Sequence, residues 1–271
     1  MSGAPVRPPA VAGLFYPARP EEIEAALREL LVPVAAPVTA RAVIVPHAAW
    51  MYSGAVAGAV YGRVAVPRRV IVLGPNHTGL GAAGAVMARG AWALPGDAVP
   101  IDEPLATALL AASPLLVEDR LAHRREHAIE VQLPFLRRRT PGLGFVPVTL
   151  GRIDLDFCAA VGRAVAAAVR AAGEPVLIVC STDLNHYEAD AVARRKDRLA
   201  IDAMLAVDPA RLAAVVDEHR ISMCGLAPAL ATLVALRELG PGPTELVRYA
   251  TSGEVSGDYA SVVGYAGLIL R

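Results

Sequence analysis

The sequence is poor in the residues that would assign it to several common protein classes. Its 271 residues include three cysteines, none in C-x-x-C spacing, which argues against a disulfide framework and against a zinc knuckle. Aromatic residues make up 5% of the chain and charged residues 19%, and Lys196 is the only lysine. The formal net charge is +0, so electrostatics give no reason to expect nucleic acid or an anionic membrane as a partner.

Phosphate-binding and targeting motifs are also missing. No G-x-x-x-x-G-K-[ST] run occurs, and Gly79, Gly81 and Gly84 do not fit G-x-G-x-x-G, so we expect no nucleotide cofactor. Residues 1–9 contain no apolar stretch of signal-peptide length, and no run of about 18 apolar residues is free of charges and breaks. We therefore expect a cytoplasmic protein whose thiols stay reduced and can bind a metal or act as nucleophiles.

Short apolar runs alternate with helical patterns along the chain. Residues 42–45, 70–73 and 176–180 are short and rich in β-branched side chains, which is typical of buried parallel strands. The remaining predicted elements are a strand at 145–150, helices at 20–31, 54–64, 104–112, 126–138, 155–172, 190–206, 209–218 and 228–239, and closing strands at 244–250 and 259–270. This alternation predicts an α/β fold, a single domain over residues 1–271 with a central, mostly parallel sheet flanked by helices. Residues 1–11 are predicted to be an extended arm.

Three histidines follow three of the predicted strands. His47 comes two residues after the first strand, His77 ends the Gly-Pro-Asn-His loop after the second, and His186 lies in the polar loop after the third. Loops at the carboxyl ends of neighbouring parallel strands share one edge of a sheet, where ligands bind. We therefore expect these imidazoles to converge, either to bind Fe, Cu or Zn or to transfer protons near neutral pH.

Cys224 and the segment from Glu126 to Glu130 are further candidates. Cys224 precedes a predicted helix, whose N-terminus would lower the thiol pKa, although a buried structural cysteine fits the sequence equally well. His127 and Glu130 would share one face of a helix, where we expect them to act as partners behind a metal-binding histidine. Direct metal ligation and a surface pair are the alternatives. His123 stands among charged residues and is predicted to be exposed.

Six short blocks, in the same order along the chain, resemble the Memo family, whose bacterial and archaeal members are often named AmmeMemoRadiSam system protein B. The resemblance extends over almost the whole sequence. The blocks are AGLFYP at 12–17, PHAAWMYSG at 46–54, GPNH at 74–77, EHAIEVQLPFL at 126–136, STDLNHY at 181–187 and CG at 224–225.

This resemblance implies a fold similar to that of class III extradiol dioxygenases of the LigB type, which hold non-haem Fe(II) with two histidines and a glutamate. It implies that His47 and His77 are metal ligands and that Cys224 stands where those dioxygenases have the glutamate. His186 then matches their acid/base histidine, and Asp183 would orient it or join the site. Because a thiolate favours softer metals, including Cu(I), the expected cofactor is one Fe(II) or Cu ion, with Zn as an alternative.

Three functions are consistent with these residues. The first is a metal-dependent redox or oxygenase-like enzyme that acts on an unknown small substrate. The second is a non-catalytic binding or scaffold protein whose cleft takes a peptide or a small acid. The third is a hydrolase or transferase with Cys224 as nucleophile and His186 or His47 as base. The family resemblance also implies a pathway shared with radical-SAM and AMMECR-type proteins.

Overall fold

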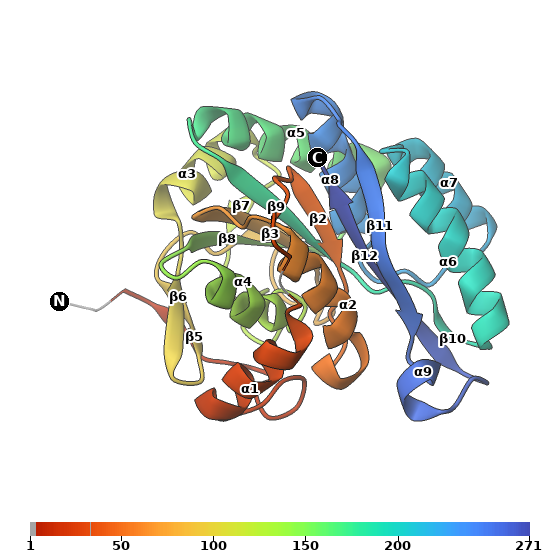
Figure 1. The fold of residues 1–271 in the computed structure, drawn as a ribbon. Coiled ribbons are helices and arrows are strands. Elements are labelled where there is room, and N and C mark those ends of the chain that lie inside the picture. Colours follow the sequence, from red (N-terminus) through yellow and green to blue (C-terminus); the bar gives the residue numbers. More distant parts are fainter. Residues whose placement is uncertain (1–3, 33) are drawn as a thin grey trace.

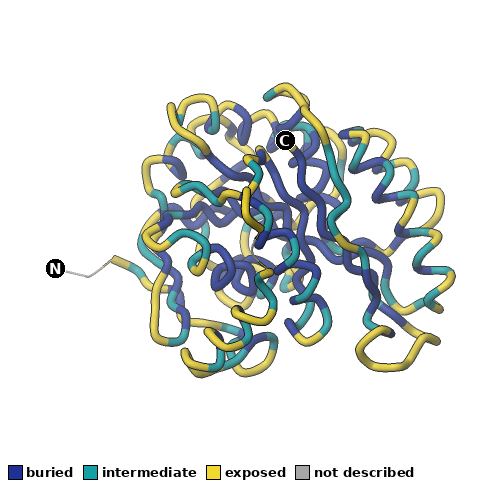
Figure 2. The backbone as a smooth tube through the Cα atoms, in the orientation of Figure 1, coloured by how far each residue is buried: buried dark blue, intermediate teal, exposed yellow. Residues whose placement is uncertain are grey.

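The apolar runs predicted as strands form the middle of one large sheet (Figure 1). The computed structural model describes residues 4–32 and 34–271. In it, β2 (Ala42–Val45), β9 (Val176–Ser181), β3 (Arg69–Pro75) and β8 (Gly144–Leu150) lie side by side in that order, and all are parallel. Their residues are almost all buried, as expected for strands covered on both faces. Figure 2 shows these strands as the buried centre of the molecule.

Antiparallel pairs join the central strands to both margins of this sheet. On one side β12 (Val262–Leu270) pairs with β2, and β11 (Thr244–Thr251) and β10 (His186–Glu188) both pair with β12. On the other side β4 (Gly84–Val86) runs antiparallel to β8 and is followed by β7 (Val117–Glu118). The predicted single-domain α/β fold is confirmed, and the sheet is parallel in its centre and mixed as a whole.

Helices cover both faces of the sheet. Figure 1 shows α1 (Pro20–Leu30), α2 (Trp50–Arg63) and α4 (Leu133–Arg139) on one side, with α5 (Leu155–Ala171) and α8 (Leu226–Leu239) on the other. Four helices remain. Helix α3 (Glu103–Ala112) packs on α5, and α6 (Asp190–Leu205) lies beside β12. Helix α7 (Pro209–Glu218) packs on α6 and α8, and α9 (Gly253–Ser256) is short.

Aspartates fix the starts of three of these helices. Asp102, Asp154 and Asp208 precede α3, α5 and α7, and each side chain accepts a hydrogen bond from the backbone N–H three residues further on. Such caps satisfy one of the free N–H groups of the first turn. The local sequence therefore sets these helix boundaries.

The N-terminal region differs from the predicted free arm. Val6–Arg7 forms the short strand β1, which pairs in parallel with β5 (Ala91–Leu94) of a hairpin completed by β6 (Asp97–Pro100). This small sheet was not among the predicted elements, and residues 1–3 of the predicted arm lie outside the described residues.

The predicted helix at residues 126–138 is wrong in its first half. Residues 126–127 are irregular and 128–129 form a turn. Glu130–Gln132 is a short 3-10 helix, and only Leu133–Arg139 forms the α-helix α4. The Glu126 carboxylate accepts hydrogen bonds from the backbone N–H groups of His127 and Ala128, which gives this backbone an alternative to helical pairing.

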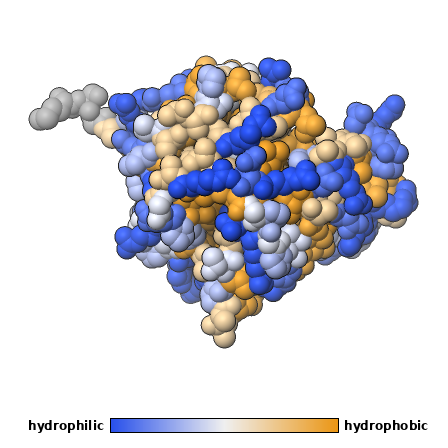
Figure 3. Space-filling view, turned by 90° about the horizontal axis from the view of Figure 1, so that it is seen from above, coloured by the Kyte–Doolittle hydropathy of each residue, from blue (hydrophilic) through white to orange (hydrophobic). Residues whose placement is uncertain are grey.

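The outer surface is mixed in character. Seen from above, hydrophilic and apolar side chains alternate across the visible face (Figure 3). Among the described residues, no helix is long and apolar enough to cross a membrane.

Candidate metal centre

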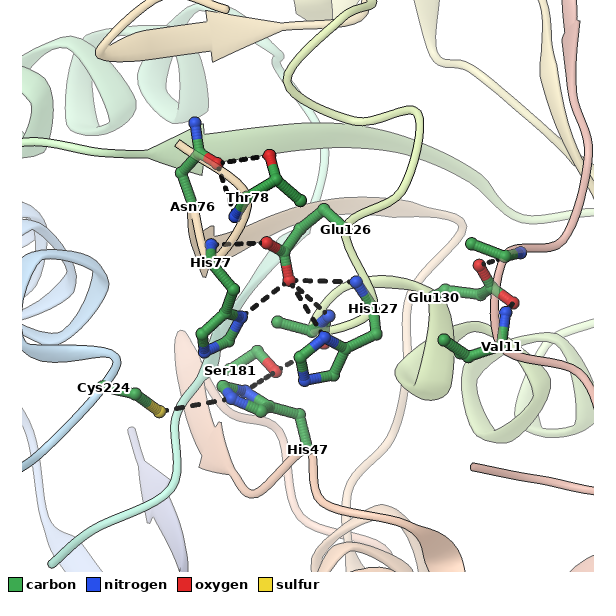
Figure 4. A network of polar contacts seen from close by, with 12 residues as sticks. Val11, His47, Asn76, His77, Thr78, Glu126, His127, Glu130, Ser181 and Cys224 are labelled. Atoms are coloured by element: carbon green, nitrogen blue, oxygen red, sulfur yellow. Dashed lines mark hydrogen bonds and ion pairs between the residues drawn. The ribbon is translucent and has the colours of Figure 1, made fainter. Parts of the chain in front are cut away.

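Three histidines and a cysteine meet at the carboxyl ends of β2, β3 and β9 (Figure 4). His47 follows β2 and His77 follows β3, and these two strands flank β9 in the sheet. One ligand atom each of His47, His77 and Cys224 lies within 4.8 Å of the others, close enough to hold one metal ion. From the sequence we predicted that His47, His77 and His186 converge. His47 and His77 do lie in one such group, whereas His186 falls in a separate group with Asp183 and Cys224.

Cys224 reaches this point because Gly225 packs tightly against the end of β9. A Cβ atom at position 225 would lie 2.3 Å from the Cβ of Thr182, so only glycine fits without a shift. The Gly225 N–H donates to the Thr182 hydroxyl at 3.1 Å. This contact brings the Cys224 sulfur to 3.2 Å from Nε2 of His47.

A hydrogen-bond network fixes the protonation of the His47 ring. The Ser181 hydroxyl donates its proton to the carbonyl of Ala128 at 2.6 Å and accepts from the Gln132 amide at 2.9 Å. Its contact with Nδ1 of His47, at 3.0 Å, therefore requires that Nδ1 carries the proton. Nε2 of His47 is left with a lone pair directed at Cys224, as a metal ligand requires.

Glu126 is the hydrogen-bond partner that orients the ring of His77. One carboxylate oxygen accepts from Nδ1 of His77 at 2.9 Å, and the other accepts from the His77 backbone N–H at 2.7 Å. Burial raises the pKa of Glu126, but the hydrogen bond and charge of His77, together with the Ala128 and His127 contacts, outweigh it and lower the pKa to about 2. The ionised carboxylate orients the imidazole and leaves its Nε2 free.

His127 lies against His77, with ring centroids 4.6 Å apart and an angle of 18° between the planes. Burial and the neighbouring imidazoles lower the pKa of His127 to about 4 and that of His47 to about 3. Both rings are therefore neutral near pH 7, the form that binds metals. His127, His77 and Glu126 make up a second group with metal-ligand spacing.

His186 and Asp183 lie on the Cys224 side of the cluster. Nδ1 of His186 donates to the carbonyl of Ser222 at 2.9 Å, which leaves Nε2 free. Ligand atoms of Asp183, His186 and Cys224 lie within 4.8 Å of one another. The Asp183 carboxylate accepts from the His47 backbone N–H at 2.7 Å, and burial raises its pKa.

The thiol of Cys224 differs from the sequence expectation. The helix N-terminus was expected to lower its pKa, but burial, with a further contribution from the charge of Asp183, raises that pKa far above the ordinary value. The thiol is therefore protonated and faces the lone pair of His47.

Glu130 does not lie behind a histidine. One carboxylate oxygen pairs with Arg7 at 2.6 Å and with the Ala10 N–H, and the other accepts from Val11 and Tyr16. The predicted pairing of His127 and Glu130 on one helical face is wrong because residues 126–129 are not helical, and Glu126 takes the position expected of Glu130.

The prediction that His123 is exposed is wrong. Its side chain is fully buried against Trp92, and its Nδ1 lies 2.9 Å from the hydroxyl of Thr149. Sequence reasoning also missed Ser181, Gln132 and Ser222, which contact the histidines or their partners, because single polar residues of these types carry no distinctive pattern.

Comparisons with known proteins identify the family of this chain. The model of the family described as Memo-like protein matches residues 7–269. A MEMO1 family protein of Methanopyrus kandleri, MK0963, is 43% identical and aligns over 98% of this chain and 99% of its own length. MTH_45 of Methanothermobacter thermautotrophicus is 40% identical over 97% and 99%, and a relative in Aquifex aeolicus is 38% identical over 97% and 98%. Over nearly its full length, the chain belongs to the Memo family.

Proposed function

We propose that the protein holds one transition-metal ion, Fe(II) or Cu with Zn as an alternative, between His47, His77 and Cys224. Its reaction would be a metal-dependent redox or oxygenase-like conversion of a small substrate. When bound, such a metal supplies a redox-active or Lewis-acidic centre beside the substrate.

One observation carries this proposal: three donor atoms from three separate loops lie within 4.8 Å, and a hydrogen bond occupies Nδ1 of each imidazole, which leaves Nε2 available as the donor. Two imidazoles and a thiol form a donor set suited to Fe, Cu or Zn. Ser181 contacts Nδ1 of His47, and Glu126 contacts Nδ1 of His77. Metal-binding histidines commonly have such a hydrogen-bond partner at the ring nitrogen that does not bind the metal.

His186 and Asp183 are assigned to proton transfer. The ring of His186 is half-buried and its Nε2 is free, so it can exchange protons with a ligand at the mouth of the site. Asp183 is buried beside it, and its raised pKa favours the form that can donate a proton. His186 lies close enough to Cys224 to take its thiol proton.

A cysteine hydrolase is the second candidate because Sγ of Cys224 is 3.2 Å from Nε2 of His47. The pKa values argue against it. A reactive thiolate requires a lowered thiol pKa and a histidine that can hold the proton. Here burial raises the pKa of Cys224 and lowers that of His47 to about 3.

The test is metal binding by the full chain and matched variants. Protein purified without an affinity tag under anaerobic conditions should contain, or take up, one equivalent of Fe(II), Cu(I) or Zn(II). His47→Ala, His77→Ala and Cys224→Ala should each lose this uptake. The matched controls are Cys158→Ala and His219→Ala, which lie outside the cluster and should retain it. No uptake by the unaltered chain, or equal uptake by all variants, refutes the proposal and favours a non-catalytic binding protein.

A further inference from the structure

The strand that begins with His186 carries a β-bulge. In the antiparallel pair of β10 and β12, His186 lies opposite Val263 and Glu188 opposite Val262, so two steps along β10 correspond to one along β12. Tyr187 is the additional residue. Bulges often lie next to functional sites, where they redirect a side chain.

Tyr187 also has an unusual backbone conformation. Its φ is 62°, in the left-handed region that tyrosine rarely adopts. Val207 and Arg220 are the other non-glycine residues with positive φ in the part of the chain that the structure describes, and each directly follows the C-cap of a helix, where this conformation is common. Tyr187 lies in a strand and does not follow a helix, so this explanation does not apply to it.

The residues on either side hold Tyr187 in place. The His186 N–H donates to the Ser222 hydroxyl at 2.8 Å, and Glu188 pairs with Lys196 at 2.6 Å. The Asn185 amide donates to Glu188 at 2.6 Å. Tyr187 is 79% exposed, so burial of this residue does not compensate for the strained backbone. Strain that the surroundings enforce is typical of functional sites.

The ring lies at the edge of the metal centre. Its centroid is 5.5 Å from that of His186, at an angle of 63°.

A second aromatic ring contacts another histidine of the cluster. The centroid of Phe15 lies 4.6 Å from that of His127. Only 5% of the residues are aromatic. Two aromatic rings against histidines of this site are therefore more than the composition of the chain would lead one to expect.

We propose that Tyr187 contacts the ligand of this site, and that the bulge holds its ring in solvent so that a flat aromatic ring of the ligand packs against it. The inference rests on the proposed function, because the polar end of that ligand would lie at the metal centre. Aromatic rings pair favourably in offset or edge-to-face geometry, which gives the site a preference for aryl over alkyl ligands.

The test uses Co(II)-loaded protein and two metal-chelating probes with the same head group, benzohydroxamate and acetohydroxamate. The readout is the ratio of their dissociation constants, followed by the change in the Co(II) absorption spectrum. Tyr187→Phe should keep the aryl preference of the unaltered chain. Tyr187→Asn should reduce it about 3- to 10-fold, the size of a lost aromatic pair. Asparagine tolerates positive φ, so this variant should melt at no lower temperature.

Arg220→Asn is the control, since it relieves a strained backbone elsewhere and should leave the ratio unchanged. An unchanged ratio in Tyr187→Asn overturns the inference while leaving the metal centre intact. A marked loss of melting temperature in Tyr187→Asn also overturns it, because the ring would then stabilise the fold. Failure of the unaltered chain to bind Co(II) overturns the proposed function and this inference together.

Discussion

Two buried glutamates four residues apart offer a direct test of the site. Glu126 and Glu130 are both fully buried, and each carboxylate accepts four hydrogen bonds. Two of those on Glu126 come from His77, whereas those on Glu130 come from Arg7 and the N-terminal segment. Glu126→Gln and Glu130→Gln therefore make the same chemical change at similar burial, and only the first touches a predicted metal ligand.

The expected magnitudes differ between stability and metal binding. In either variant the amide NH₂ replaces an accepting oxygen and leaves at least one buried donor unpaired, which costs about 1–3 kcal/mol of unfolding free energy. Glu130→Gln also leaves the buried Arg7 guanidinium without its charged partner, so its total loss of unfolding free energy is expected to be larger, about 3–5 kcal/mol. Loss of the partner behind a metal-binding histidine typically weakens metal affinity by about 10- to 100-fold. Glu126→Gln should show both losses, and Glu130→Gln only the loss of stability.

Urea unfolding measures the first quantity, and competitive titration with Zn(II) against a chelator measures the second. Both variants should be titrated well below their unfolding transitions so that the folded state is compared. Equal loss of metal affinity in the two variants would refute the reasoning, because the effect would then follow from stability alone. An unchanged affinity in Glu126→Gln would refute the assigned role of the carboxylate.

Three further outcomes are expected. His186→Ala should retain the metal that His77→Ala loses, and turnover should fall by about 10²- to 10⁴-fold once a substrate is known; loss of metal in His186→Ala would make it a ligand. Stability should fall as pH drops below about 6.5, because His47, with its pKa lowered to about 3, stays neutral in the folded protein while the unfolded chain binds the proton. A second loss is expected between about pH 4.5 and 2 as Glu126, with its pKa lowered to about 2, becomes protonated. Each group contributes up to about 1.4 kcal/mol per pH unit within its window, and urea unfolding across pH 8 to 3 checks both, with a flat profile contradicting them.

The fold was largely predictable because its central strands are short, apolar and β-branched. Such runs have few alternatives once they alternate with amphipathic helices. The β5–β6 hairpin was missed because its strands are four residues each and carry no clear alternation of apolar and polar side chains. Its two-residue turn, Pro95-Gly96, was the available signal.

The convergence of His47 and His77 was also predictable, since it follows from a general rule of parallel sheets. The partners of those histidines were not. A spacing of three residues identifies neighbours only on a helix, and the Glu126 carboxylate itself prevents a helix at that position by pairing with nearby backbone N–H groups. Glu126, which orients His77, therefore lies in a segment without the helical spacing that could have identified it from the sequence.

The protonation state of Cys224 could not be predicted from the sequence. A helix N-terminus acts only through its first turn, whereas burial acts from every side, including the neighbouring Asp183. Burial depends on how Gly225 packs against Thr182, a contact between segments 43 residues apart. Because the thiol proton must leave when sulfur binds a metal, this packing also sets how strongly metal affinity rises with pH. A contact made by a glycine therefore governs the chemistry of the cysteine beside it.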